Sequence, residues 1–402
     1  MNFRLYIAKR YLFAKRSFNI INLISRISIA GVAFASAALI IVLSAFNGLE
    51  NLVESLYAKF DPEIKITAAK GKTFSTDSIP LNQLQQIADI DIISQTLEEV
   101  ALFKYKKNQT IGVIKGVDEN FAQISELDSA ILSGDFTLTE NDFNYATIGY
   151  GVAQKLAINL GDIATNLWVI VPKRENKKSI NPLNDFRKKY IIPTAIFGIN
   201  ADFDDKYVIA PLRFVRSLLN KSNSEVSALE IKLKPNVTPE QTKQKIQQVL
   251  GENYIVKTRF ELNEILYKTN KTEKWITFFI LSFILVIATF NIISSMAMLI
   301  LDKKNDFKTF KSMGATDFDI KRIFFYNGML INGIGAIIGI GFGTALCLLQ
   351  QYVGLIPLQG GIVEYYPVKV MWQDFIFIVA IVGIIGAIAS WYPVRFLKTV
   401  SD

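Results

Sequence analysis

Gly71, Lys72 and Thr73 spell the GKT that ends a phosphate-binding loop. That motif requires another glycine five residues before Gly71, and the chain has Ile66 there, inside an apolar run typical of a strand. The sequence contains no histidine and a single cysteine, Cys347. Without histidine it can form neither a histidine-based triad nor a histidine zinc site. We therefore predict no catalytic site, no metal site and no nucleotide site in this chain.

A charge-rich segment, LDKKNDFKTFKSMGATDFDIKR, lies between two of the most apolar runs of the chain. Residues 304–313 can form about three helical turns before a glycine. Phe307, Phe310 and Met313 recur there at helical spacing, which places an apolar ridge among lysines. A connector that only turned the chain would not need this ridge. Such a helix suits two situations equally well: a groove on a partner protein, or the surface of a bilayer.

The elements that flank this segment are predicted to cross a membrane. Of all residues, 50% are hydrophobic and 20% are charged, and the mean hydropathy is +0.28, which is too apolar for an ordinary soluble domain. A hydrocarbon core of about 30 Å requires about 20 helical residues. Four runs meet or approach that length, at residues 27–48, 275–301, 323–352 and 371–397. The predicted fold class is a polytopic α-helical membrane protein with four transmembrane helices and a large α+β extracytoplasmic domain between the first two.

The distribution of positive charge predicts the orientation of these helices. Lysine and arginine near the ends of spans resist translocation and so indicate the cytoplasmic side. They gather before the first run, between the second and third, and after the fourth, whereas the connector between the third and fourth carries only Lys369 against Glu364. Both termini are therefore predicted to be cytoplasmic. The other predicted segments are a cytoplasmic interfacial helix (1–26), a cytoplasmic connector (302–322), a cytoplasmic tail (398–402), an outer domain (49–274) and an outer loop (353–370).

The outer domain mixes strand-like and helical runs. Strands are predicted at residues 63–68, 110–117, 166–172, 190–199, 227–234 and 254–260, and helices at 81–88, 151–160, 211–220 and 239–250. The last helix has Thr238 as a predicted cap, Pro239 at its first position and Gly251 after its end. Residues 49–60 and 261–274 are predicted to be paired stalk helices that continue the first two spans outward.

Two further patterns have a structural and a functional interpretation. Gly335, Gly339 and Gly343 recur every four residues in the third span, which forms a stripe where another helix can approach closely. The basic loop PKRENKKSINPLNDFRKKY, at residues 172–190, is either a solvated hairpin loop or a protruding arm that docks an acidic partner or the edge strand of a partner. The residues of the arm that we single out are Pro172, Lys173, Arg174, Pro182 and Arg187.

Three stretches carry a resemblance to a known family. They are SRISIAGVAFASAALIIVLSAFNGLE (25–50), IGYGVAQKLAINLGD (148–162) and ATFNIISSMAMLILDKKNDFKTFKSMGA (288–315). The chain resembles the lipoprotein-releasing ABC transporter permeases of the LolC/LolE family, a branch of the MacB/FtsX-like permeases. The similarity covers nearly the whole length, with the same order of one span, a large outer domain and three spans.

This resemblance implies a non-catalytic permease subunit in the inner membrane of a diderm bacterium. Such a subunit extracts lipoproteins from the outer leaflet and passes them to a periplasmic chaperone. The implied partners are a second permease chain, in a homodimer or heterodimer, and two copies of a separate ATPase that binds the ATP and magnesium. The chain itself would carry no cofactor, and no nucleic-acid partner is implied.

The resemblance also assigns roles to residues. The connector would be a coupling helix that fits a groove on the ATPase, with the candidate residues Asp306, Phe307, Phe310, Lys311, Met313 and Gly314. Val42, Phe46 and Asn291 would face the substrate. Loop 172–190 matches by position the hook that binds the chaperone.

Two other functions stay open. One is an efflux or export permease of the MacB type, although those permeases usually carry the ATPase on the same chain. The other is a signalling transducer of the FtsX type, in which ATPase cycling bends the outer domain to activate a cell-wall hydrolase. The outer domain of such transducers is typically much shorter than residues 49–274.

Overall fold

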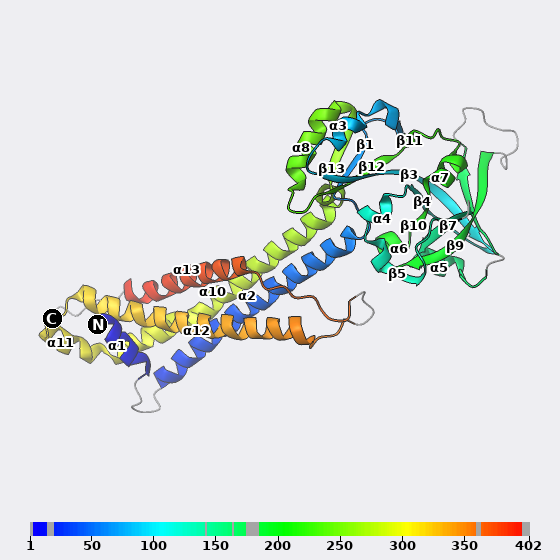
Figure 1. Ribbon diagram of the computed structural model, residues 1–402. Coiled ribbons are helices and arrows are strands. Elements are labelled where there is room, and N and C mark those ends of the chain that lie inside the picture. Colours follow the sequence, from blue (N-terminus) through cyan, green and yellow to red (C-terminus); the bar gives the residue numbers. More distant parts are fainter. Residues whose placement is uncertain are drawn as a thin grey trace. The chain divides into compact units, whose positions relative to one another are not determined.

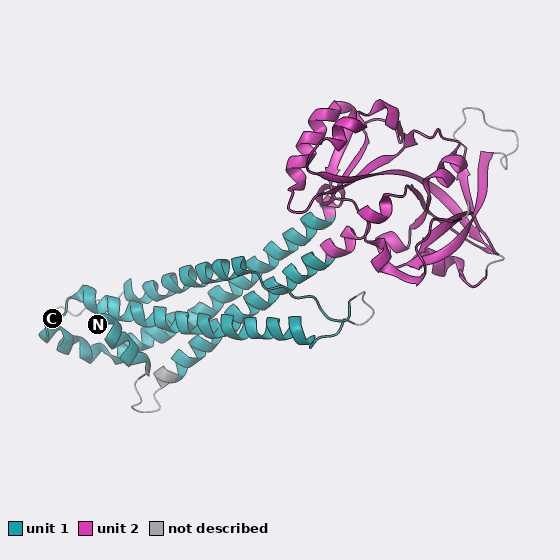
Figure 2. Ribbon diagram, in the orientation of Figure 1, with its two compact units in different colours: residues 1–52, 266–402 teal, residues 53–265 magenta. Residues whose placement is uncertain are grey.

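The structure is a computed structural model that describes residues 3–13, 20–140, 143–162, 165–173, 185–358 and 363–395. The chain forms two compact units (Figure 2). Unit 1 consists of residues 1–52 and 266–402, and unit 2 consists of residues 53–265. In chain order, unit 2 is therefore inserted between the two parts of unit 1.

Helices make up most of unit 1 (Figure 1). Four are long: α2 (Ile20–Ala58), α10 (Glu264–Asp302), α12 (Asp317–Val353) and α13 (Trp372–Arg395). Two are short: α1 (Phe3–Phe13) and α11 (Lys304–Ser312). Among the described residues, four helices are long and apolar enough to cross a membrane: Leu23–Ala58, Glu264–Asp302, Asp317–Val353 and Trp372–Arg395. Their buried faces form one apolar core, to which α2, α10, α12 and α13 all contribute.

The helices of unit 1 correct the predicted interfacial segment and extend the first two predicted spans. The predicted interfacial helix 1–26 is shorter, because α1 ends at Phe13 and residues 20–26 already belong to α2. In the other direction α2 continues to Ala58 and α10 begins at Glu264, which corresponds to the stalk helices predicted at residues 49–60 and 261–274. The polar residues in these extensions are acceptable in a helix, so nothing in them ends it.

The glycine stripe of α12 lies against α2. A Cβ atom added at Gly339 would lie 2.1 Å from the carbonyl oxygen of Ala33, and one added at Gly343 would lie 2.1 Å from Cγ2 of Ile40. Contacts this short cannot be made by real carbon atoms. The two helices therefore approach to a distance that only glycine permits at these positions.

Unit 2 is an α+β unit with thirteen strands among its described residues. The strands are β1 (Ile64–Ala68), β2 (Phe74–Ser75), β3 (Ile90–Tyr105), β4 (Asn108–Val117), β5 (Ile131–Gly134), β6 (Thr139–Glu140), β7 (Phe143–Gly149), β8 (Leu167–Pro172), β9 (Phe186–Phe197), β10 (Tyr207–Pro211), β11 (Glu225–Val226), β12 (Ala228–Leu233) and β13 (Tyr254–Thr258). The main sheet has the order β13-β1-β12-β3-β4-β10-β7-β9-β5, with β8 beside β3 and β9. β10 pairs in parallel with β4, and β7 pairs in parallel with β9.

Short helices cover the sheet of unit 2. They are α3 (Leu81–Gln85), α4 (Phe121–Ile124), α5 (Tyr150–Leu156), α6 (Ala201–Asp204), α7 (Leu212–Leu219), α8 (Pro239–Leu250) and α9 (Arg259–Leu262). α5 and α7 pack on one apolar core with β3, β4, β8 and β10, whereas α8 packs on a second core with β1, β12 and β13. The long strand β3 contributes to both cores. Thr238 is the N-cap residue of α8, Pro239 is its first residue and Gly251 follows its end, as predicted, but the Thr238 side chain makes no capping hydrogen bond.

Candidate functional site

The segment predicted to couple the chain to a partner forms α11 and the turns on either side of it (Figure 1). Gly314 follows α11 with a φ of +92°, in the left-handed region that favours glycine. Thr316 then begins α12: its Oγ1 accepts the Asp319 N–H (3.2 Å), and the Asp319 carboxylate accepts the Thr316 N–H (3.0 Å). This capping box satisfies backbone donors at the start of α12. We call α11, the turn at 313–316 and the facing helix α1 the elbow.

The apolar ridge predicted on α11 is divided between two environments. Phe307 is buried in the core of unit 1, where its ring centroid lies 5.5 Å from that of Phe324. Phe310 is half-buried, and its ring centroid lies 6.3 Å from that of Phe3. Met313 is 72% exposed. The inner end of the ridge therefore packs into the chain's own core, and only its outer end can contact a partner.

Helix α1 brings residues to the elbow that the sequence did not indicate. The Arg4 Nε donates to Asp319 Oδ1 (2.6 Å), and the Tyr11 hydroxyl donates to Asp306 Oδ2 (2.9 Å). Burial and the Asp306 carboxylate raise the pKa of Tyr11 above its usual value. Asp306, a predicted coupling residue, is thus engaged by α1. Arg4 and Tyr11 come from the opposite end of the chain, so no local spacing pattern could have found them.

The outer surface of the elbow combines a hollow with positive charge. The hollow has a volume of about 470 Å³ and is lined by Phe3, Arg4, Met313, Gly314, Ala315 and Asp319. The Lys311 Nζ lies 3.1 Å from Asp317 Oδ1, and the Arg322 guanidinium lies over the Phe318 ring at 4.2 Å. An exposed apolar tip beside a hollow and cationic side chains is suited to binding a protein surface that has an acidic rim.

The predicted substrate-facing residues lie on two helices of unit 1. Val42 and Phe46 are half-buried, one helical turn apart on α2, and Asn291 is exposed on α10. Their role therefore stays a prediction.

The predicted chaperone-docking loop is described only at its base. Pro172 ends β8, and the Lys173 N–H donates to the Asp185 carbonyl (2.7 Å). On β9, the Arg187 guanidinium donates to the Leu219 carbonyl of α7 (2.8 Å), so this side chain braces the sheet. Arg174 and Pro182 lie outside the described residues. Docking through this loop stays a prediction.

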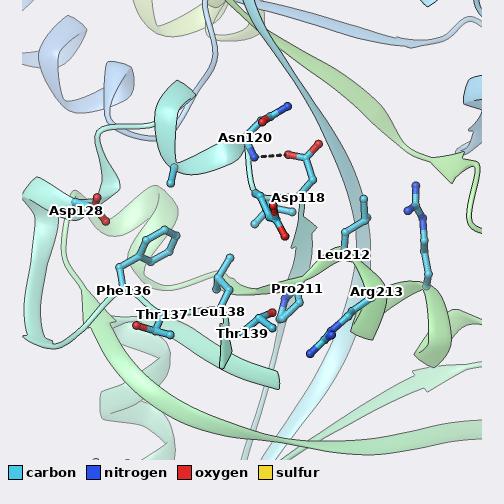
Figure 3. A pocket seen from close by; sticks show the side chains of 14 residues that line it. Asp118, Asn120, Asp128, Phe136, Thr137, Leu138, Thr139, Pro211, Leu212 and Arg213 are labelled. Carbon is cyan, nitrogen blue, oxygen red and sulfur yellow. Dashed lines mark hydrogen bonds between the residues drawn. The ribbon is translucent and has the colours of Figure 1, made fainter. Parts of the chain in front are cut away.

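Unit 2 contains a larger hollow, of about 780 Å³, at the carboxyl ends of the parallel strands β4 and β10 (Figure 3). At one wall Asp118 accepts hydrogen bonds from the Gln95 N–H (2.8 Å) and the Asn120 N–H (3.2 Å), and burial raises the pKa of its carboxyl group. At another wall Arg213 donates to Asn144 Oδ1 (2.9 Å). These bonds hold the turn after β4 and the start of α7, which gives both charges a structural role.

A second group of charges is buried in unit 2. The Lys115 Nζ lies 2.8 Å from Glu230 Oε1, and the Lys65 Nζ lies 3.1 Å from Glu98 Oε1. Burial alone would raise the pKa of Glu98, but Lys65 and Lys115 hold it below its usual value. The Lys115 Nζ also lies 4.6 Å from the ring centroid of Phe60, which is in the turn after α2. Such paired charges fix the strand positions relative to each other and to Phe60.

Two family models match the chain. Residues 25–249 match the model described as MacB-like periplasmic core domain, which is more than half of the chain. Residues 278–401 match the model described as FtsX-like permease C-terminal. The first match contains nearly all of unit 2, and the second contains α11 and the turn at 313–316, but not α1.

Several similar proteins carry the name of the lipoprotein-releasing system. The lipoprotein-releasing system transmembrane protein LolC of Buchnera aphidicola subsp. Schizaphis graminum is 28% identical over 350 residues, which cover 86% of this chain and 82% of that protein. The corresponding LolE of Haemophilus influenzae is 24% identical over 412 residues, which cover 98% of this chain and 96% of that protein.

The crystal structure of the periplasmic region of MacB from Actinobacillus actinomycetemcomitans is 9% identical, with a TM-score of 0.36, over 54% of this chain and 98% of that one.

Proposed function

This chain belongs to the family of the MacB-like periplasmic core domain, and on that premise we propose that it is the permease subunit of an ABC transporter that releases lipoproteins from the inner membrane. The observation that carries the proposal is the extent of the similarity to lipoprotein-releasing relatives. With the LolE relative it covers 98% of this chain and 96% of that protein. It therefore includes both units and all four apolar helices, rather than a single shared domain.

Removal of a lipoprotein from the bilayer requires an external source of free energy. Transfer of an acyl chain from a bilayer to water costs about 0.8 kcal/mol per CH₂ group, so a multiply acylated protein cannot leave unaided. The Gly-Lys-Thr tripeptide at residues 71–73 follows β1. A phosphate-binding loop would need a glycine at position 66, where β1 instead has a fully buried isoleucine, Ile66. We therefore propose that ATP is hydrolysed by a separate polypeptide, present in two copies beneath two permease chains.

The elbow is the part of the chain that we propose contacts this ATPase. Its exposed Met313 tip, its hollow and its lysines provide a surface, and Phe307 ties that surface to the core of unit 1. A force applied to α11 would therefore be transmitted to the long helices instead of being absorbed by a loose loop. In this proposal the elbow is cytoplasmic, unit 2 is periplasmic, and a periplasmic chaperone receives the lipoprotein.

Depletion of the chain in its native host tests the proposed function. Mature lipoproteins destined for the outer membrane are expected to accumulate in the inner membrane, as measured by separating the two membranes and quantifying lipoproteins in each. Normal sorting after complete depletion would contradict the proposal. Normal sorting together with loss of cell-wall hydrolase activity would favour the FtsX-type transducer instead.

A further inference from the structure

Asn47 of α2 is a buried polar residue that bonds to two other helices and to the connector before α13. It is 2% exposed. Its Nδ2 donates to Asp374 Oδ2 (2.5 Å) and to the Lys369 carbonyl oxygen (3.3 Å), and its Oδ1 accepts from the Lys274 Nζ (2.5 Å). Asp374 lies in the first turn of α13 and is 5% exposed, and Lys274 lies on α10. One side chain thus joins α2, α10 and α13.

The connector that precedes α13 is held against α2 beside Asn47. The Lys369 N–H donates to the Ser44 carbonyl (2.9 Å), and the Lys369 Nζ donates to Asn51 Oδ1 (2.6 Å). The backbone at Pro367 crosses α2 at Gly48, where an added Cβ atom would lie 2.3 Å from the Pro367 carbonyl oxygen. The connector can therefore approach α2 only because residue 48 is glycine.

The start of the same connector is held by α12. The Gln350 Nε2 donates to the carbonyls of Ile356 (3.2 Å) and Tyr366 (3.1 Å), and its Oε1 accepts the Ile356 N–H (2.8 Å). Gln350 is itself 7% exposed. The described parts of the connector are thus held by α12 at Ile356 and Tyr366 and by α2 at Lys369, and Asn47 bonds both to Lys369 of the connector and to Lys274 of α10.

The chemistry of position 47 suits a neutral amide. An amide has one acceptor, which here faces the Lys274 ammonium, and two N–H donors, which face the Asp374 carboxylate and the Lys369 carbonyl. A carboxylate would bind the ammonium but would face two oxygens with no hydrogen to donate. An aliphatic side chain would leave both charges without this partner, which is costly at a buried position.

We propose that Asn47 is a positioning residue for transport: its amide, placed between the Lys274 ammonium and the Asp374 carboxylate, latches α2 to α10 and α13, and the latch opens when these helices separate. The link to transport rests on the proposed function, whereas the latch itself rests only on the geometry of unit 1. Hydrogen bonds to charged groups are stronger than hydrogen bonds between neutral groups. The bonds of Asn47 to Lys274 and Asp374 therefore favour the closed arrangement of the helices over the separated one.

The latch is tested by measuring the distance between α2 and α13, because a carboxylate at position 47 would still bind Lys274 of α10 but would repel Asp374 of α13. The full-length chain, with Cys347→Ala, Glu50→Cys and Gln373→Cys, is spin-labelled and reconstituted in lipid nanodiscs. The unaltered latch is expected to give one narrow distance distribution. Asn47→Asp is expected to raise the population at longer distance by about tenfold, because it replaces charge-assisted bonds with repulsion from Asp374.

A charge exchange supplies the decisive comparison. In Asn47→Asp combined with Asp374→Asn, the new carboxylate accepts from Lys274 and from the new amide, so the narrow distribution is expected to return. Asn51→Asp is the matched control: it makes the same change one turn later on α2 and keeps its bond to Lys369, so the distribution is expected to stay narrow. If Asn47→Asp gives the parental distribution, or if the double variant is no narrower than Asn47→Asp, the latch is overturned.

The efficiency of transport gives a second measurement. A merely structural role for Asn47 would not lower the lipoprotein released per ATP in the single variant and restore it in the double variant. With the ATPase that co-purifies with the chain, the number of lipoproteins released per ATP hydrolysed is expected to fall about tenfold in Asn47→Asp and to recover in the double variant. Equal ratios in all three chains would overturn the positioning role. If the parental chain itself releases no lipoprotein while the distances behave as expected, the proposed function fails and the latch stands.

Discussion

Single residues at the elbow show how neighbours in a spacing pattern acquire different roles. Phe307, Phe310 and Met313 lie on one ridge by sequence, yet Phe307 packs on Phe324 while Met313 is 72% exposed. The difference arises because Phe307 packs on Phe324 of α12, whereas Phe3 of α1 contacts only the middle residue, Phe310. A variant at Phe310 would disturb that packing, so Met313 is the better probe of a partner.

Met313→Asp is expected to weaken binding of the ATPase while the chain itself folds and inserts normally. The methionine is exposed in the isolated chain, so an aspartate is solvated there, but a partner's groove would have to bury the charge. Recovery of the ATPase in affinity purification is expected to fall about tenfold or more.

Leu132→Asp is the matched control for this prediction. It introduces the same charge at another exposed apolar residue, which is 60% exposed on β5 of unit 2. ATPase recovery with this control is expected to equal that of the unaltered chain. Full recovery with Met313→Asp would show that the exposed tip of the elbow is not the contact.

At the scale of elements, local patterns found those helices and strands whose period is uniform. The alternation in residues 63–68 and the proline start of 239–250 correspond to β1 and α8. β3 was not predicted, because its sixteen residues run from one core to the other and its buried side chains do not keep one period. The candidate site shows the same limit: α11 and its final glycine follow from local signals, whereas Arg4, Tyr11 and the Asn47 cluster depend on contacts between distant segments.

The packing of α12 on α2 gives a prediction at this scale. Gly339→Ala is expected to destabilise the helix bundle by about 1–3 kcal/mol, because the new methyl group would overlap the backbone of α2 at Ala33. Gly341→Ala is the matched control, since a Cβ atom there meets nothing within 4 Å and alanine favours a helix over glycine. Thermal unfolding of both variants in the same detergent measures the difference. A Gly339→Ala chain as stable as Gly341→Ala would contradict the close contact.

For the whole molecule, charge and chain order together predict how the two units are distributed across the membrane. The elbow is rich in lysine, whereas Lys369 is the only lysine or arginine in the sequence of the connector before α13. Lysine and arginine near a span favour the cytoplasm, so the elbow and the connector are expected on opposite sides. Because α2 and α10 flank unit 2 in the chain and are each long enough to cross once, unit 2 is expected on the same side as the connector.

Labelling of single cysteines tests this topology in cells. In a Cys347→Ala chain, Leu132→Cys in unit 2 and Tyr365→Cys in the connector are expected to react with a membrane-impermeant maleimide when only the outer membrane has been opened. Lys308→Cys on α11 is expected to react only after the inner membrane is broken as well. All three positions are exposed, so a failure to react reports the membrane barrier rather than burial. Reaction of Lys308→Cys before lysis would place the elbow outside the cytoplasm, where no ATP-driven partner could contact it.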